Sequence, residues 1–280
     1  MKGRKFWCAL AALGIGFATA GASTDAFAQK KPKDKPAAPA PNEPATSKKD
    51  LNFDLAGVSW GQSIKAVTEA VGKILDEDYK PLYAKVSPGV KMQQLDAALA
   101  EEKSAFARSK IDFGKTPVAL DSGPLKGEYT YNNKEAKLEF SRKGVTFHFF
   151  FIQDKLWKII AEKKLGEKEA AGKDFADAVA KVAKDLGVAG RIQAADAAKG
   201  LYAQEVDWKD AKTHLRVIER SAATVAFAYE DQATLANLTT LRANKPPATN
   251  EVDPAVAAVT RKETPPPEPP KPDPKKAPKK

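Results

Sequence analysis

Residues 145–152 carry the stretch that decides the fold, Val-Thr-Phe-His-Phe-Phe-Phe-Ile. Aromatic and β-branched residues of this kind favour β-strands. Turn-forming residues flank the run at 142–144 and at 153–155, so its length is that of one strand. Because its far end is apolar on both faces, we predict a central strand that is covered on both sides, partly by another subunit if one is present.

The sequence on either side of this strand continues as an antiparallel meander. Strands are predicted at 128–131, 137–141 and 156–162, where apolar residues recur with a period of two. The segments between them are short and of ordinary turn composition, as in Asn132-Asn133. Such spacing is typical of consecutive hairpins.

Two helices are predicted before the meander. Ser63 is a suitable N-cap, and apolar residues follow it at helical spacing as far as Ile74. Ser87-Pro88 predicts the start of the second helix, because proline suits the first helical position. One face of this second helix carries Met92, Leu95, Leu99 and Phe106.

The same order of elements is predicted again after residue 166. Asp174 begins a third helix, and Gly187 ends it. Strands are then predicted at 202–208, 214–219, 224–229 and 235–241. The expected fold class is α+β, with two helix-plus-antiparallel-meander units. These units are either a tandem repeat or two strand-rich segments that resemble each other by chance.

The amino end has the features of a secretory signal peptide. Basic residues at Lys2, Arg4 and Lys5 precede an apolar stretch, and an A-x-A sequence ends at Ala28. We expect cleavage near Ala28 and a soluble periplasmic or secreted protein with no transmembrane segment; the alternative is an uncleaved anchor. Cys8, the only cysteine, lies in this leader, so the mature chain has no disulfide and no cysteine-ligated metal.

The composition of the two flanks completes the domain organisation. Residues 29–50 contain no Val, Ile, Leu, Met, Phe, Trp or Tyr, and residues 246–280 are rich in proline and lysine. Segments that bury no apolar surface cannot offset the entropy lost on ordering, so both are predicted to be disordered. The predicted organisation is a signal peptide (1–28), a linker (29–50), unit 1 (51–165), unit 2 (166–245) and a tail (246–280).

The formal charge of +10 is concentrated outside the predicted core. Residues 51–245 hold thirty basic and twenty-seven acidic side chains, and export separates the chain from the chromosome, so we expect no nucleic-acid partner. The last ten residues are strongly basic and either contact an anionic envelope polymer or act as a solubilising spacer. The candidate contacts are Lys271, Lys275, Lys276, Lys279 and Lys280.

No catalytic residue, cofactor site or metal site is predicted. His148 and His214 lie in separate predicted strands with no second histidine or motif carboxylate beside them, which favours structural roles. The one carboxylate pair that two neighbouring predicted strands would bring together is Glu128 and Glu139. An enzyme that uses such an unrecognised carboxylate site is the least favoured alternative.

Aromatic side chains concentrate on the first meander. They form either part of the core or an exposed sheet face that docks a protein partner. The candidate partner-binding residues are Tyr129, Tyr131, Phe149 and Trp157.

The motif Trp60-Gly61-x-Ser63 resembles the start of many exported bacterial proteins in which a helix packs on a small antiparallel sheet. Over residues 57–75 by motif, and beyond them by element order, the chain is similar to β-lactamase inhibitor proteins and small outer-membrane assembly lipoproteins. It differs from the lipoproteins because it lacks a lipobox, which argues against a lipid tether. The resemblance implies a non-catalytic binding or scaffold protein whose partner is another envelope protein; the alternative is a module whose basic arms grip anionic polymers.

Overall fold

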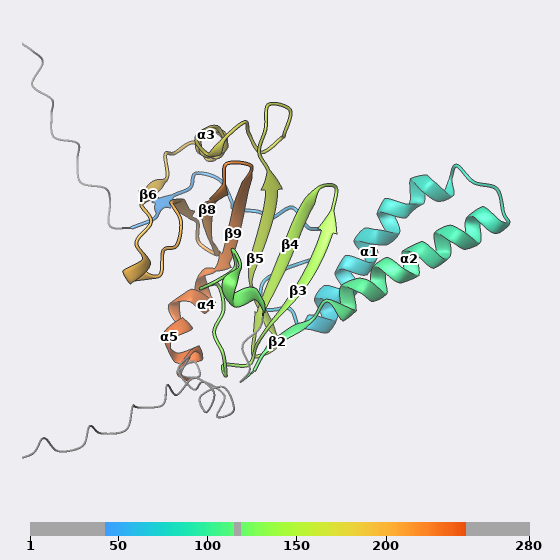
Figure 1. Ribbon diagram of the computed structural model, residues 1–280, viewed down its shortest axis with the longest axis horizontal. Helices are drawn as coiled ribbons and strands as arrows, with labels where there is room; N and C mark the ends of the chain where they lie inside the picture. The colour runs from blue at the N-terminus through green and yellow to red at the C-terminus, as the bar shows by residue number, and fades with distance from the viewer. Residues whose placement is uncertain (1–42, 115–118, 245–280) are drawn as a thin grey trace, which may run out of the picture. The chain divides into compact units, whose positions relative to one another are not determined.

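The structure, a computed structural model, describes residues 43–114 and 119–244. These residues form a nine-stranded sheet in the order β1-β7-β8-β9-β5-β4-β3-β2, with β6 also paired to β7 (Figure 1). The strands are β1 (Ala45–Thr46), β2 (Ile111–Phe113), β3 (Glu135–Arg142), β4 (Val145–Ile152), β5 (Lys155–Lys164), β6 (Arg191–Gln193), β7 (Glu205–Lys209), β8 (Thr213–Ser221) and β9 (Thr224–Asp231). The helices are α1 (Ile64–Tyr83), α2 (Val90–Arg108), α3 (Phe175–Leu186), α4 (Gln232–Ala236) and α5 (Leu238–Leu241), with 3-10 turns η1 (Ala119–Ser122) and η2 (Ala197–Lys199).

Two antiparallel meanders, β3-β4-β5 and β7-β8-β9, join through their last strands. Strand β5 pairs with β9 in antiparallel register, with Ile160 opposite Ala228. The sheet is therefore continuous across residues 165 and 166, where the boundary between the two units was predicted. Helices and antiparallel meanders give the α+β class that the sequence predicts, and the duplication of the two halves stays a prediction.

One face of the sheet is apolar and is covered by helices. Alternate residues of β3, β4 and β5, such as Leu138, Phe149 and Ile159, pack against α1 and α2. Their counterparts on β7, β8 and β9 pack against α3. In Figure 1, α1 and α2 form a hairpin that extends beyond the sheet edge next to β3, so much of α2 is exposed and Phe106 is its one buried residue.

The opposite face of the sheet mixes apolar and charged side chains. The apolar ones, such as Phe150 and Ile160, pack against the segment 119–134 and against α4 and α5. The charged ones alternate with them along the strands, because successive side chains of a strand point to opposite faces and residues i and i+2 share a face. We call this surface the charged face.

The predicted helix caps of α1 and α3 are confirmed. The Ser63 hydroxyl accepts a hydrogen bond from the amide of Ala66, and the Asp174 carboxylate accepts one from the amide of Asp177. Gly187 ends α3 in the left-handed conformation, at φ 71°. The predicted start of α2 at Ser87-Pro88 is wrong by about two residues, because the helix begins at Val90 after Gly89 and has no side-chain cap.

Two predicted strands are wrong. Residues 128–131 form a loop, because the short strand β2 occupies the edge of β3 that they were expected to pair with. Residues 235–241 lie in α4 and α5, which follow an N-cap at Asp231 whose carboxylate accepts from the amide of Thr234. Both errors come from alternation in apolar residues that contact the sheet without belonging to it.

Part of the predicted disordered linker belongs to the sheet. Ala45–Thr46 pairs in parallel with β7, and Lys49 forms an ion pair with Asp185 at 2.8 Å. Backbone pairing thus orders residues 43–50 although they bury little apolar surface. The predicted signal peptide (1–28), the rest of the linker and the tail (246–280) lie outside the described residues.

Candidate functional site

The charged face has its centre where the two meanders meet. Lys158 of β5 lies directly opposite Glu230 of β9, and Arg216 of β8 lies opposite Ala228 of β9. The register therefore brings two cations and a carboxylate together from three neighbouring strands. All three side chains are largely buried.

Arg216 connects three carboxylates. Its guanidinium nitrogens lie 2.7 Å from Glu128, 3.0 Å from Glu205 and 2.9 Å from Glu230. Burial alone would raise the pKa of Glu128, but Arg216 and Lys158 lower it to about 2. The same cations, with His214, hold the pKa of Glu230 well below its usual value.

Lys158 is held by the loop that was predicted to be a strand. Its ammonium donates to the Glu128 carbonyl at 2.6 Å and to the Glu128 carboxylate at 2.8 Å. It also lies over the Trp157 ring, 4.4 Å from the centroid. Burial lowers the pKa of Lys158, and the neighbouring carboxylates of Glu128 and Glu230 oppose that shift.

His214 extends the network toward β7. Its two ring nitrogens lie 3.2 Å from Asp207 and 2.9 Å from Glu230. Burial opposes protonation, but hydrogen bonds to these two carboxylates raise the pKa of His214 to about 9. The imidazole is therefore protonated at neutral pH, and both nitrogens act as donors.

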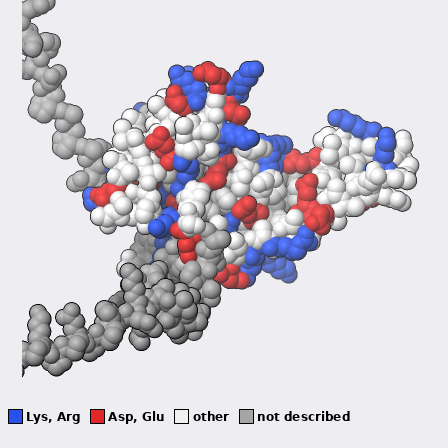
Figure 2. Space-filling model, in the orientation of Figure 1, with Lys and Arg blue, Asp and Glu red and all other residues white. Residues whose placement is uncertain are grey.

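A cavity of about 130 Å³ opens beside this network. Five cationic side chains line it against three carboxylates, those of Glu128, Glu205 and Glu230. The cations are Lys126, Lys158, Arg216, Arg220 and Arg242. The lining residues thus carry more cations than carboxylates, although Glu135 and Glu162, outside the lining, lie 2.9 Å from Arg242 and 3.9 Å from Arg220. Figure 2 shows that basic and acidic side chains are intermixed over the visible face of the molecule, so this local excess is not part of a large basic patch.

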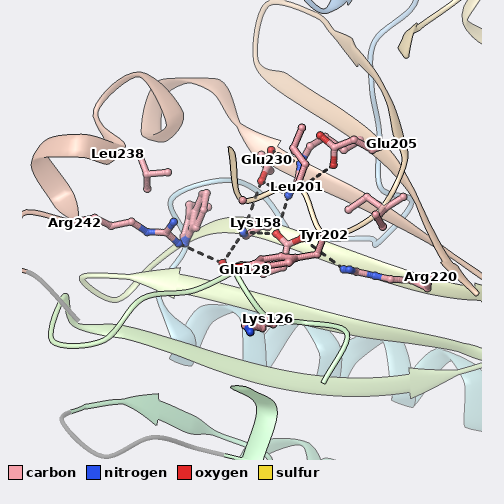
Figure 3. A pocket seen from close by; sticks show the side chains of 16 residues that line it. Lys126, Glu128, Lys158, Leu201, Tyr202, Glu205, Arg220, Glu230, Leu238 and Arg242 are labelled. Carbon is pink, nitrogen blue, oxygen red and sulfur yellow. Dashed lines mark hydrogen bonds and ion pairs between the residues drawn. The ribbon is translucent and has the colours of Figure 1, made fainter. Parts of the chain in front are cut away.

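Among the buried cations of this cavity, Arg220 has the longest ion pairs. Its side chain is 10% exposed, and its Nε and Nη2 atoms make no hydrogen bond with any described residue. The nearest carboxylate oxygens belong to Glu128, at 3.5 Å from Nη2, and to Glu162, at 3.9 Å from Nε. Figure 3 shows the guanidinium beside Tyr202 and Glu128.

Tyr202 and Lys126 lie at the exposed rim of the cavity. Tyr202 is 55% exposed, and the Lys126 ammonium lies 5.4 Å from the centroid of its ring. A mouth that combines a flexible cation with an aromatic ring leaves the interior accessible from solvent.

A second ionic cluster lies on the same face, across β3, β4 and β5. His148 is within 3.4 Å of Glu139 and 3.6 Å of Glu162, and Lys137 binds Glu139 at 2.6 Å. Hydrogen bonding to His148 lowers the pKa of Glu162. Among the described residues, no group of three metal-ligating side chains has the geometry to hold a metal ion.

The predicted aromatic docking face is not exposed. Tyr129, Tyr131, Phe149 and Trp157 are between 0% and 8% exposed, so the core alternative describes them. Both tyrosine hydroxyls donate to the carboxylate of Asp121, and Phe149 faces the opposite side of the sheet, toward α1 and α2. Tyr129, Tyr131 and Trp157 pack with the apolar side chains of the charged face.

The other candidate residues named from the sequence are the two histidines, the Glu128 and Glu139 pair, and the tail lysines. Each histidine does have carboxylate neighbours, but these come from other strands, so spacing along the chain did not show them. Glu128 and Glu139 do not form a pair: Glu128 binds Lys158 and Arg216, and Glu139 binds Lys137. The tail lysines 271, 275, 276, 279 and 280 lie outside the described residues.

The sequence of β5 and β8 carries a signal of the charged face. Charged residues alternate with apolar ones in Lys158-x-Ile160-x-Glu162 and in His214-x-Arg216-x-Ile218-x-Arg220. In a strand with both faces covered, such alternation indicates a buried polar layer. Which charges meet depends on the pairing of β5 with β9, and local sequence does not specify that pairing.

The membrane and family comparisons complete the description of the site. Of the helices in residues 43–114 and 119–244, none combines the length and the apolar character that crossing a membrane requires. No protein-family model matches the chain, and neither a curated protein nor a solved structure matches it. The proposals that follow therefore rest on the geometry and on the sequence.

Proposed function

We propose that this chain is an exported, non-catalytic binding protein that holds a small oxyanion, a carboxylate or phosphate group, in the cavity of the charged face. The observation that carries the proposal is Arg220, a buried guanidinium on the cavity wall whose Nε and Nη2 donors are unused by the described residues. Its recorded ion pairs are long, 3.5 Å to Glu128 and 3.9 Å to Glu162, and an oxyanion would supply closer, charge-assisted hydrogen bonds.

The size and the polarity of the cavity favour a small anionic group. About 130 Å³ accommodates several waters or one oxyanion, but no large cofactor. The surplus of cations favours an anion over a neutral ligand. Arg220 is well suited to carboxylate and phosphate because its planar fork can donate two parallel hydrogen bonds.

The ionisation of the network favours binding without chemistry. The carboxylates of Glu128 and Glu230 are held ionised by their cationic neighbours. Lys158 donates to two oxygens of Glu128, and His214 to two carboxylates, so either base would have to break these bonds before it could accept a proton. A general base needs an available lone pair, and these hydrogen bonds occupy both Lys158 and His214.

The proposed export of the protein rests on the sequence of its amino end. The basic residues, the apolar stretch and the A-x-A sequence ending at Ala28 support export to the periplasm or the medium. In that compartment the anion is either a free solute or an acidic group of another envelope protein. The two sources share the same chemistry at Arg220 and differ in size.

The experiment titrates the mature chain, residues 29–280, with inorganic phosphate and with acetate, and follows binding by calorimetry and by the midpoint of thermal unfolding. We expect both anions to bind and to raise the midpoint, because a ligand that binds only the folded state stabilises it. Arg220→Gln should lower the affinity roughly tenfold to a hundredfold, since a hydrogen bond to a charged group contributes about 1.5–3 kcal/mol.

Two further variants make the titration specific. Arg108→Gln is the matched control, because Arg108 is an exposed arginine on α2 that pairs with Glu101 far from the cavity. Lys126→Gln at the exposed rim should weaken binding without affecting the folded state. In the absence of ligand, Arg220→Gln should be as stable as the parent protein or more so, because it removes a poorly paired buried charge.

A tetraglutamate peptide distinguishes the two sources of the anion. Binding of the peptide alone, lost in Arg220→Gln, would identify an acidic group of a protein as the ligand. If neither the peptide nor the small anions bind, or if Arg220→Gln binds them as the parent does, the proposal is wrong.

A further inference from the structure

A second cavity, of about 510 Å³, lies on the other face of the sheet, beneath α3. Its lining is mostly apolar: Ala178 and Val182 line it from α3, and Leu215 and Phe227 line it from β8 and β9. Its volume falls in the range of small-molecule sites, which are mostly apolar cavities with a few convergent polar groups. The full thickness of the sheet separates it from the Arg220 cavity.

Lys163 of β5 is one polar group in this cavity. Its ammonium has no carboxylate within 4.0 Å among the described residues, and its closest recorded interaction is with the Phe227 ring, 4.5 Å from the centroid. Burial lowers the pKa of Lys163, and the carboxylate of Asp54 opposes that shift without forming an ion pair. The amine is therefore partly desolvated and lacks a close counterion from the described chain.

Tyr229 of β9 is the second polar group. It lines the same cavity, and its hydroxyl makes no hydrogen bond with any described residue. Burial raises the pKa of Tyr229 to about 12, so the hydroxyl stays protonated and can donate. Lys163 and Tyr229 are both half-buried, so this cavity holds one cation and one hydroxyl donor that no described residue engages.

Three other charged residues line the cavity: Lys181 and Asp185 have partners, whereas Asp50 has no ion pair among the described residues. Lys181 lies 3.2 Å from Asp177, and Asp185 lies 2.8 Å from Lys49. Lys163 is therefore the cation available inside the cavity, and an anionic head group would satisfy both its ammonium and the Tyr229 hydroxyl.

We propose that this cavity binds a single-chain amphiphile with a carboxylate head, of the fatty-acid class. The carboxylate accepts hydrogen bonds from Lys163 and Tyr229, and the hydrocarbon chain lies between α3 and the sheet. The ammonium repels cationic amphiphiles, and a neutral alcohol gains the apolar contacts without the ion pair. This site is independent of the oxyanion cavity, because it uses other residues on the opposite face.

The experiment compares three probes of equal chain length, dodecanoate, dodecanol and dodecyltrimethylammonium, titrated into the mature chain below their micelle concentrations. Binding is measured by calorimetry. We expect dodecanoate to bind most tightly, and Lys163→Met to reduce its affinity about tenfold while leaving dodecanol unchanged. Val182→Phe, which fills the cavity, should weaken both.

The matched control is Lys164→Met, which changes the next lysine of the same strand, an exposed one. If Lys163→Met does not fold, as judged by circular dichroism, Tyr229→Phe tests the same head-group contact. Arg220→Gln should leave dodecanoate binding unchanged, so this test and the oxyanion test can fail separately. Equal binding of all three probes, or dodecanoate binding that is unaffected by Lys163→Met and Val182→Phe, would overturn the proposal.

Discussion

At the scale of single residues, the stability of the charged face depends on each buried charge keeping its partner. Arg216 contacts three buried carboxylates, and it is the one ion-pair partner recorded for Glu205 among the described residues, so shortening it would leave that carboxylate without a counter-charge. Buried ion pairs add little net stability when complete, but removing one partner typically costs about 3–5 kcal/mol. Arg220 is the exception within this network, because its donors are unused. That contrast between two arginines of the same strand separates a structural role from a ligand-binding one.

His214 makes stability depend on pH above neutrality. Its pKa is raised from 6.5 to about 9 in the folded state, so its contribution is complete below pH 6.5 and is lost as the pH rises toward 9. The loss amounts to about 3 kcal/mol at most, by linkage. Urea unfolding at pH 6 and at pH 9 should show this decrease for the parent chain.

The corresponding control is His214→Gln, which keeps a donor but does not titrate. Its free energy of unfolding should be lower than that of the parent at pH 6, and should change little between pH 6 and pH 9. If the variant retains the full pH dependence of the parent, then a group other than His214 causes it.

At the scale of elements, strands with strong local patterns were predicted best. Strand β4 has the predicted bounds, and α1 and α3 begin after the predicted caps, because these signals depend on neighbours along the chain. The loop 128–131 and the helices α4 and α5 were predicted wrongly, since their apolar residues cover a sheet edge or face rather than extend it. The cavity lined by Arg220 was not predicted, because it forms only where β5 pairs with β9, and local sequence does not specify that pairing.

Gly190, just before β6, shows how closely one connection packs. A Cβ at this position would lie 2.5 Å from Val206 and 2.6 Å from the Trp208 ring, both buried on β7. We therefore expect Gly190→Ala to destabilise the protein by about 1–3 kcal/mol, the usual cost of overpacking a core. Gly144→Ala is not an equivalent control because φ is positive there, but Gly114→Ala is, because no atom of the described residues lies within 4 Å of its added Cβ.

Chemical denaturation of both alanine variants measures this difference. Equal midpoints for Gly190→Ala and Gly114→Ala would mean that the backbone before β6 moves freely enough to accept the methyl group, contrary to the packing seen here.

At the scale of the whole molecule, the chain combines a nearly neutral core with basic flanks. The last ten residues contain five lysines and one aspartate, and they remain a candidate contact for anionic envelope polymers. Deletion of residues 261–280 should reduce recovery of the protein in envelope fractions at low salt but not at high salt, because exposed charges are screened over about 10 Å at 0.1 M. Fractionation that responds to neither salt nor deletion would leave the tail as a spacer.

The ionic layer between the two meanders also acts against misfolding. If β9 slid by two residues along β5, Lys158 would face Ala228 or Gln232 in place of Glu230, and buried charges would lose their counterparts. A slip by one residue would turn the charged side chains toward the helices. Purely apolar strands would tolerate such errors far better. The buried charges at the pairing of β5 with β9 therefore favour the correct register over misaligned ones while the two halves of the chain assemble.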